Sequence, residues 1–470
     1  MKEAFETGPL DPRTWVRDPV LLTALVVGLL LRVAPLVLFP QFECLRDECI
    51  YRTMAQNIVD GQGLTVSNKG WLPSPGYPYL LAWSKMLFGN MQAVKAVQIA
   101  LSLGTVGMIY GIARDVGDRR TARIAAWLFA LNPTIAWFTN TMWIETIYIF
   151  FLMAAAVFML SSWRSNTWQP AAWSGGMLGG AILFRGVATY LPPLWVLAAI
   201  YPTDDPFSFE AWKRSARERW RAVVACLVAV VIVVAPYSWY GSKTYGGFMV
   251  TDATVGHVLF LGNNDFPPLT FDYGNGMLTQ PLYGKYLATG RRPCRRDVPP
   301  VESSKCEVGE AVAWVRQHPG KFLSRVPIRI AQLLNPNSFL TRHVRWGYWP
   351  GFPWWAKEGL AIGIVLLSSG LCLVGTVGAW ARARGPFAMI AVGTTLYTVL
   401  TIALMYGMTR FRLPLEALWT VYLAMFLANP RESLHALRST EWRLAGLLLT
   451  LPPVLALLLW YLPTGFPVFW

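Results

Sequence analysis

The run LLTALVVGLLLRVAPLVLFP at residues 21–40 holds one charge, Arg32, and the hexapeptide RDECIY follows it at residues 46–51. A run of about 20 apolar residues is long enough to cross a bilayer as a helix. The hexapeptide sets two adjacent acids, Asp47 and Glu48, just beyond this run. Carboxylates at a membrane are stable where they meet water or a partner. The stretch therefore predicts a membrane helix that leads into a polar site.

The composition of the whole chain agrees with a membrane protein. Of its 470 residues, 54% are hydrophobic and 14% are charged, against about 25% charged in soluble domains. Trp (23) and Tyr (18) are abundant, as they are where rings anchor at membrane interfaces. We therefore expect an all-α polytopic membrane protein. The first span lacks a cleavage site of small residues, which favours an uncleaved anchor over a signal peptide.

Hydropathy predicts about eleven transmembrane helices in three regions. Residues 1–240 form an N-terminal transmembrane module with a first outer loop at 41–91, residues 241–353 form a second outer region, and residues 354–470 return to the membrane. Arg185-Gly186 and Pro192-Pro193 interrupt the pair of spans across 171–201. The expected spans are 20–40, 92–112, 122–138, 144–162, 171–186, 187–201, 222–240, 356–380, 386–406, 411–428 and 444–462.

The net charge of +15 arises mainly from Lys and Arg between the spans, so it indicates membrane topology and anionic lipid and no nucleic acid. With the N-terminus in the cytoplasm, the short outer connections hold only Arg185, Arg410 and Arg412. This asymmetry predicts a multi-pass protein of the inner (plasma) membrane, with 41–91 and 241–353 on the extracytoplasmic side. The short cytoplasmic segments hold Arg114, Arg119, Arg120, Arg123, Arg164, Lys213, Arg214, Arg217, Arg219, Arg221, Arg382, Arg384, Arg431, Arg438 and Arg443.

Each outer region contains a pattern typical of an interfacial helix. Ile50, Met54 and Ile58 recur every four residues, and Gly61 is a plausible stop. In the second region Lys321, Arg325 and Arg329 recur in the same way. We expect the first helix to lie on the membrane and the second to bind anionic lipid or substrate phosphate.

Six cysteines are scattered along the chain, and their spacing fits no zinc motif. Cys226 and Cys372 fall in spans, where they fill apolar space. Cys44, Cys49, Cys294 and Cys306 fall in the outer regions, where disulfides persist. A Cys294–Cys306 bond would close a loop of about 13 residues and contribute about 3 kcal/mol; the sequence leaves open whether it forms.

Three acids are candidates for chemistry. Asp47 and Glu48 are either solvated charges at a helix N-terminus or a catalytic pair in which a partly desolvated carboxylate removes a proton from a hydroxyl. The same acids could hold a divalent metal ion. Glu145 opens the fourth span on the same outer side, where a carboxylate needs a partner or water.

Three arginines on the outer side are candidates for binding phosphate. Arg410-Phe411-Arg412 departs from the inside-positive trend, and Arg185 lies at the end of a short span. The planar guanidinium donates two parallel hydrogen bonds to phosphate. The alternative is that these side chains extend to the lipid headgroups. Together with the acids, they suggest a transferase that activates a hydroxyl and releases a phosphate.

These motifs resemble those of the GT-C membrane glycosyltransferases. Asp47-Glu48-x-x-Tyr51, Pro73-x-Pro75-Gly76-Tyr77-Pro78 and Arg410-Phe411-Arg412-Leu413-Pro414 are similar to motifs of the dolichyl-phosphate-mannose protein mannosyltransferases and the aminoarabinose transferases. The resemblance implies inverting transfer of a sugar from a polyprenyl-phosphate donor to an acceptor. It implies Asp47 as the base beside Glu48, and Arg410, with Arg412 and Arg185, at the donor phosphate. Tyr51, Glu145, Lys321 and Arg325 would contact substrate.

One motif departs from the resemblance. Where the aminoarabinose transferases carry Glu-Lys-Pro-Pro, this chain has Leu72-Pro73-Ser74-Pro75. The missing Glu and Lys argue against their sugar and against a metal site built on that Glu. Two rival functions stay open: a lipid-linked glycan ligase or polymerase, and a transporter of lipid or sugar, which would be expected to carry inverted repeats and charges at mid-span.

The predicted topology can be tested by labelling. Cysteines placed singly at Ser67 or Asn275, in a background without the native cysteines, should react with a membrane-impermeant thiol reagent on intact cells, because the basic loops hold the opposite side in the cytoplasm. Labelling that requires permeabilised cells would reverse the orientation and the side of the site.

Overall fold

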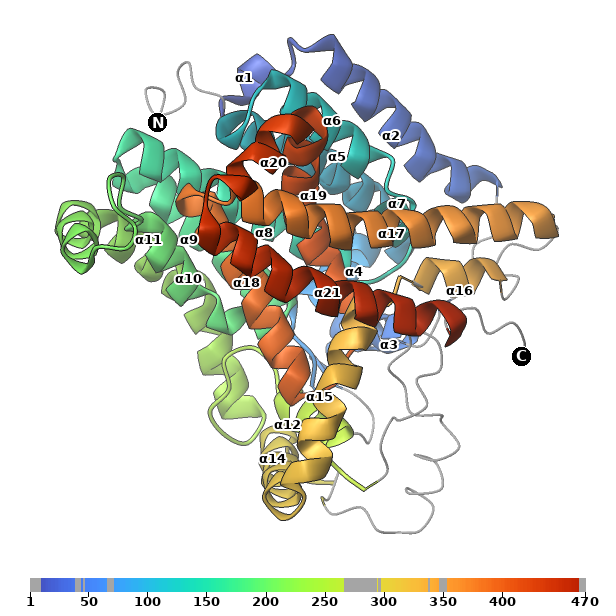
Figure 1. Ribbon diagram of the computed structural model, residues 1–470. Coiled ribbons are helices and arrows are strands. Elements are labelled where there is room, and N and C mark those ends of the chain that lie inside the picture. The colour runs from blue at the N-terminus through green and yellow to red at the C-terminus, as the bar shows by residue number, and fades with distance from the viewer. Residues whose placement is uncertain are drawn as a thin grey trace.

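The computed structural model describes residues 10–38, 44, 47–65, 72–265, 294, 297–336, 339–345 and 353–464. Within these residues every regular element is a helix, which confirms the all-α fold. Ser67 and Asn275 lie outside the described residues. Figure 1 shows the helices packed side by side, with α1 (Pro12–Trp15) and α20 (Pro430–Arg438) at the top.

Eight segments are long and apolar enough to cross a membrane in the part of the chain that the structure describes. They confirm a polytopic protein, whereas the predicted number of eleven is not confirmed. The eight are Pro19–Leu38 (α2), Met91–Val116 (η1 and α5), Glu145–Ser165 (α8), Phe209–Thr244 (α11), Trp354–Arg382 (α17), Gly385–Leu404 (α18), Thr409–Ala428 (η3 and α19) and Glu441–Leu459 within α21 (Glu441–Thr464).

Two regions that were expected to hold continuous spans contain shorter helices. The expected span 122–138 is α6 (Arg119–Ala130) followed by α7 (Pro133–Phe138). The expected pair across 171–201 is α9 (Trp168–Phe184), the 3-10 helix η2 (Gly186–Tyr190) and α10 (Pro192–Ala199). Proline tolerates the first position of a helix but not its interior, which explains why both regions restart at proline.

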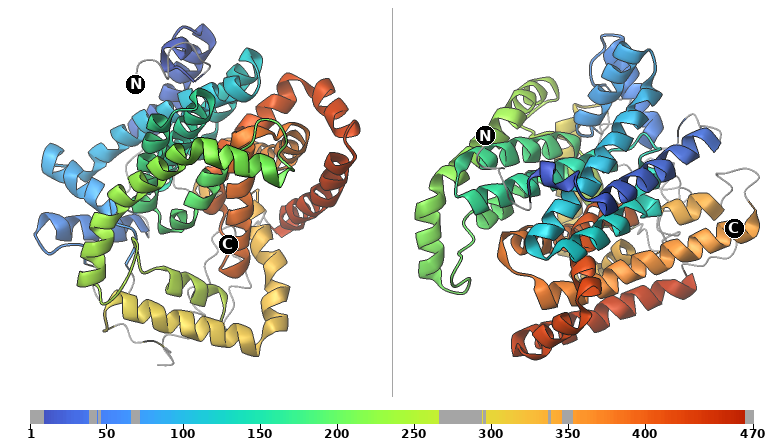
Figure 2. Two further views of the ribbon diagram at one scale, coloured as in Figure 1. Left: turned by 90° about the vertical axis from the view of Figure 1, so that its left-hand side faces the viewer. Right: turned by 90° about the horizontal axis from the view of Figure 1, so that it is seen from above.

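The remaining helices lie mainly at one end of the bundle, which we call the loop end. They come from the two segments predicted to be outside. In Figure 1 and in the left view of Figure 2, α14 and α15 lie at the bottom of the molecule, opposite α1. The elements are α3 (Asp47–Val59), α4 (Gly76–Phe88), α12 (Val255–Gly262), α14 (Pro300–Gln317), α15 (Pro319–Leu334) and α16 (Phe339–Arg345).

The break between α6 and α7 is held by a buried polar network. The Asn132 side chain accepts from the amides of Thr134 and Ile135, and so caps α7. Its Nδ2 also donates to Glu416 Oε2 at 3.0 Å. The other carboxylate oxygen of Glu416 accepts from Arg412 Nε at 2.9 Å. Since these groups are buried, each needs its partner, and the network ties the break to α19.

A second arginine supports the other side of the break. Arg32 lies fully buried inside α2, and its Nη1 donates to the carbonyl oxygen of Ala130, the last residue of α6, at 2.9 Å. Its Nε donates to Ser102 Oγ on α5 at 3.0 Å. A cation at a helix C-terminus satisfies a carbonyl that has no intrahelical partner. Arg32 is therefore a structural charge that joins three helices.

The apolar stripe of α3 packs on protein where we had expected lipid. Met54 is fully buried in a cluster with Tyr245, Met249 and Val301, and Ile50 and Ile58 pack against it. Tyr245 also donates its hydroxyl to the carbonyl oxygen of Leu64 at 3.0 Å. The second outer segment therefore covers the helix that carries Asp47. Gly61, at φ 75°, confirms the predicted helix stop.

The basic stripe of α15 also faces protein. Arg325 Nη1 donates to Asn264 O at 2.9 Å, and Arg329 Nη2 donates to Gly262 O at 2.7 Å. Both side chains are buried, so the expectation that they bind anionic lipid is corrected. Burial lowers the pKa of Arg329 to about 10, and the group stays charged at neutral pH. A Cβ at Gly262 would lie 1.8 Å from Met405 O, so this contact between the loop and the end of α18 requires glycine.

The structure contains two disulfides. Cys294 pairs with Cys306, which the sequence left open, and Cys44 pairs with Cys49. Cys226 and Cys372 are unpaired and buried, as expected.

The network at the helix break makes a testable prediction. Glu416→Gln leaves the buried Arg412 without its carboxylate, and loss of one partner of a buried ion pair lowers stability by about 3–5 kcal/mol. The free energy of unfolding, from denaturant titration in detergent, measures the loss. Glu432→Gln is the control because Glu432 pairs with Arg382 at the surface, and it should change little. Equal effects of the two variants would contradict the structural role of Glu416.

Candidate active site

Charged residues from four elements meet at the loop end. Asp47 is the first residue of α3 and Glu145 the first of α8, whereas Arg410 lies in η3 (Thr409–Arg412). Arg410 Nη1 donates to Asp47 Oδ2 at 2.6 Å, and its Nε lies 3.9 Å from Glu145 Oε1. Arg185 follows α9 directly. The structure thus brings together four of the residues predicted for the site.

Glu145 is the most deeply buried of these charges. Its side chain is 1% exposed, and neither carboxylate oxygen has a hydrogen-bond partner among the described residues. Among the described residues, Arg410 is the only cation in ion-pair range of it. A buried carboxylate is costly unless a cation or hydrogen bonds compensate it. Glu145 therefore makes a cation at the position of Arg410 necessary.

Arg410 and Asp47 are less buried than Glu145. Their side chains are 17% and 29% exposed. The guanidinium of Arg410 lies over the rings of Trp143, at 5.1 Å, and Phe411, at 5.7 Å. Aromatic faces attract cations and shield one side of them from water. Asp47 is thus held from one side by Arg410 while part of its carboxylate remains accessible to a substrate.

Arg185 also lies near Phe411. Its guanidinium is 5.0 Å from the ring of Phe411 and 5.3 Å from that of Tyr148. Its Nη1 is buried and has no hydrogen-bond partner in the part of the chain that the structure describes. No carboxylate among the described residues forms an ion pair with it. Phe411 therefore contacts two guanidinium groups, and one of them has a donor available.

The loop that carries Arg185 is fixed by residues that the sequence did not single out. The amide of Gly186 donates to Ser74 Oγ at 2.8 Å, and Ser74 donates to Asp252 Oδ2 at 2.9 Å. A Cβ at Gly186 would lie 1.5 Å from Asp252 Oδ2. Ser74 belongs to the Leu72-Pro73-Ser74-Pro75 motif, so the departure from the aminoarabinose transferases has a structural role here.

Glu48 joins two elements of the site. It is buried, and its Oε1 accepts from the amide of Met142 at 2.7 Å. Met142 lies three residues before Glu145, the first residue of α8. The contact therefore fixes α3 relative to the helix that begins with Glu145. This geometry suits a positioning role better than a second catalytic acid.

Three other predicted site residues lie in different surroundings. Arg412 is 1% exposed and donates to Glu416 and to the carbonyl oxygen of Asn335. Lys321 is exposed and lies 3.9 Å from Asp265. Arg325 contacts Asn264, as described above. Their predicted contacts with substrate stay predictions, and within the described part of the chain none of the three forms an ion pair or hydrogen bond with Asp47, Glu145 or Arg410.

Tyr51 is buried beneath the site. Its ring centroid lies 5.3 Å from that of Tyr77. Burial raises the pKa of the Tyr51 phenol above its usual value, and the charge of Asp47 raises it further. The phenol therefore stays protonated at physiological pH and remains a hydrogen-bond donor.

The described residues do not fit a divalent metal site. They include no group of three or more His, Cys, Asp and Glu that could hold an ion. The two carboxylates of the site, Asp47 and Glu145, are both in ion-pair range of Arg410. The guanidinium of Arg410 lies where a metal ion would lie between two such acids. A metal ion would therefore have to compete with Arg410.

Comparisons with known proteins bear on the family and the fold. Residues 73–239 match the dolichyl-phosphate-mannose-protein mannosyltransferase family. The archaeal oligosaccharyltransferase AglB from Archaeoglobus fulgidus, solved with an inhibitory peptide and dolichol-phosphate, aligns over 93% of this chain and 55% of its own, with TM-score 0.51 and 17% identity. The chain therefore shares its fold with this oligosaccharyltransferase, and the family match covers residues 73–239.

Other comparisons are weaker. A second structure of the Archaeoglobus fulgidus oligosaccharyltransferase, with Zn and sulfate, aligns over 93% of this chain and 52% of its own, with TM-score 0.50 and 15% identity. The chain thus spans about half the length of these structures. ArnT from Cupriavidus metallidurans, bound to undecaprenyl phosphate, is 15% identical over 87% of this chain and 77% of its own, at TM-score 0.36. No curated protein matches the chain.

Proposed function

We propose that this GT-C protein is a membrane glycosyltransferase that moves a sugar from a polyprenyl-phosphate donor to an acceptor on the extracytoplasmic side. The contact of Arg410 with both Asp47 and Glu145 carries this proposal. It sets a partly exposed carboxylate beside a guanidinium at the end of a membrane bundle. The family match at residues 73–239 and the GT-C fold support it.

Asp47 is the proposed general base. Its carboxylate takes the proton from the acceptor hydroxyl, and the oxygen forms a bond to the anomeric carbon of the sugar. The bond from that carbon to the phosphate oxygen breaks, and the electron pair leaves with polyprenyl phosphate. Attack opposite the leaving group inverts the anomeric centre. Asp47 suits this role because it is the acid of the site whose carboxylate is partly exposed.

Arg410 and Arg185 are the proposed ligands of the departing phosphate. When Asp47, Glu145 and the two arginines are all ionised, their charges sum to zero. The donor phosphate therefore brings a negative charge that needs hydrogen-bond donors. Arg185 has a donor on Nη1 that is not in use. Forked guanidinium groups suit phosphate oxygens. We favour Arg185 over Arg412 as the second phosphate arginine, because Arg412 donates to Glu416 and to a backbone carbonyl.

The contact between Arg410 and Asp47 links donor binding to the base. A phosphate that accepts from Arg410 competes with Asp47 for the same guanidinium. Donor binding would therefore weaken the hold of Arg410 on Asp47 and leave its carboxylate available to the acceptor. No step requires a metal. A chelator assay would show whether an ion is also needed.

The donor class separates this function from its rivals. Full-length protein in nanodiscs would be mixed with membranes from a deletion strain and given either polyprenyl-phosphate mannose or polyprenyl-diphosphate oligosaccharide. Mass spectrometry of the lipid, glycan and protein fractions would detect the product. Transfer from the monophosphate supports the proposal, transfer only from the diphosphate indicates a ligase, and vesicle uptake without transfer indicates a transporter.

The role of Asp47 predicts a large kinetic effect. Asp47→Asn keeps the shape of the side chain and removes its basicity, so transfer should fall about 10²–10⁴-fold. Initial rates at saturating donor measure the loss. The control is Asp60→Asn, an exposed acid just beyond the end of the same helix. A folded Asp47→Asn protein with near wild-type turnover would remove Asp47 from the mechanism.

The phosphate arginines predict a test of geometry rather than charge. Arg410→Lys and Arg185→Lys keep the charge but lose the forked donor, so each should lower transfer by about 10–150-fold, equivalent to about 1.5–3 kcal/mol. Turnover is measured while the donor is titrated. Arg382→Lys, which alters a surface ion pair, is the control. Unchanged donor affinity and turnover in a variant would assign that arginine to lipid headgroups.

A further inference from the structure

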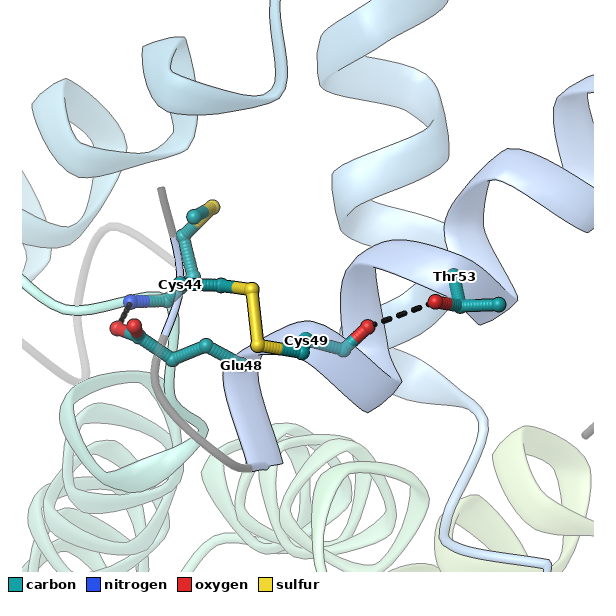
Figure 3. Close-up of a disulfide and its surroundings, with 5 residues drawn as sticks. Cys44, Glu48, Cys49 and Thr53 are labelled. Carbon is teal, nitrogen blue, oxygen red and sulfur yellow. Dashed lines mark hydrogen bonds between the residues drawn. A yellow bond between two sulfur atoms is a disulfide. The ribbon is translucent and has the colours of Figure 1, made fainter. Parts of the chain in front are cut away.

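The Cys44–Cys49 disulfide encloses the two acids of the RDECIY stretch. The cysteines are five positions apart, and Asp47 and Glu48 lie between them. Figure 3 shows the disulfide beside Glu48, at the first turn of α3. The Cys49 carbonyl oxygen accepts from Thr53 Oγ1 at 2.9 Å, which places Cys49 inside the helix. The disulfide therefore joins a residue of the helix to Cys44, which precedes it. The disulfide ties Cys44 to the first turn of α3, the turn that carries Asp47.

This segment would be poorly held without cross-links. The first amide groups of a helix have no intrahelical partners, and helix ends fray. Asp47 is the first residue of α3. Three of the contacts that hold this turn are the ion pair of Asp47 with Arg410, the hydrogen bond from the Met142 amide to Glu48, and the disulfide.

The first of these contacts is the one that the proposed reaction disturbs. When the donor phosphate accepts from Arg410, the hold of Arg410 on Asp47 weakens. At that point the base must still lie against the acceptor hydroxyl. Of these three contacts, the hydrogen bond of Glu48 and the disulfide do not involve Arg410.

We propose that the Cys44–Cys49 disulfide is a positioning element for Asp47 and that sugar transfer requires it to be oxidised. The inference rests on the proposed function. It assigns the cysteines to the orientation of the base rather than to the binding of the donor. Reduction adds two electrons and two protons and yields two thiols. The reductant in the test is a phosphine, which becomes its oxide, and oxidised glutathione restores the bond by exchange.

The test compares two pairs of substitutions in the full-length protein in nanodiscs. Cys44→Ser with Cys49→Ser removes the proposed positioning element, whereas Cys294→Ser with Cys306→Ser removes the other disulfide as the matched control. With polyprenyl-phosphate mannose and deletion-strain membranes, the first pair should lower the maximal rate about 10–100-fold, as expected for a displaced catalytic group. Its affinity for undecaprenyl phosphate, the phosphate probe, should stay within about 2-fold.

A second measurement reports how firmly the first turn of α3 is held, and it does not depend on sugar transfer. Amide hydrogen exchange in residues 47–53 should become at least about 10-fold faster in the Cys44/Cys49 variant, while exchange in residues 147–153 of α8 stays the same. The control pair should change neither peptide. Wild-type transfer and exchange in the Cys44/Cys49 variant would overturn the inference. If wild type transfers no sugar, the proposed function fails while the exchange data still decide whether the disulfide fixes the turn.

Reduction of the folded wild type covers the case in which the double variant does not fold. The phosphine should abolish most transfer, and oxidised glutathione should restore it without a refolding step. Cys44 and Cys49 are both partly exposed, so the phosphine and the glutathione can reach them. Unfolding of the whole protein on reduction would make the disulfide a folding element and overturn the inference.

Discussion

A single buried carboxylate determines the arrangement of the site. Glu145 makes no hydrogen bond and is 1% exposed, so the protein must supply a cation within ion-pair range. Arg410 is that cation, and it reaches Asp47 as well. A lysine could neutralise one acid as a point charge, but the planar guanidinium offers donors in two directions. The residue that stabilises α8 at its start is thereby also the residue that orients the proposed base.

The position of Arg410 depends on contacts deep inside the bundle. Two residues further along, Arg412 is buried against Glu416, and Glu416 holds Asn132 at the break between α6 and α7. Glu48 binds the Met142 amide, just before α8. Elements far apart in sequence thus converge by polar contacts rather than by apolar packing alone. Apolar packing is weakly directional, whereas these hydrogen bonds specify a register.

Hydropathy and charge asymmetry were sufficient to predict the all-α membrane fold and four residues that meet at the site. They could not assign partners to the arginines. Arg325 and Arg329 lie on a periodic basic stripe that is typical of a lipid-facing helix, yet they donate to carbonyl groups of the neighbouring loop. Whether such a side chain meets lipid or backbone depends on where a distant loop folds, as shown by Met54, whose stripe is covered by Tyr245 and Val301. Sequence periodicity identifies a face of a helix but not what covers it.

The charges at the loop end also bear on the proposal that the donor carries a phosphate. With only Asp47, Glu145 and Arg410, the site would have a net negative charge and would repel a phosphate. Arg185 brings the sum to zero, and the rings of Tyr148 and Phe411 hold it with no carboxylate to neutralise it. Aromatic faces stabilise the guanidinium without occupying its N–H donors. The site therefore has two cations with different partners. Arg410 is paired with the proposed base, whereas Arg185 is held by aromatic rings, so Arg185 can meet the proposed donor phosphate without giving up a carboxylate.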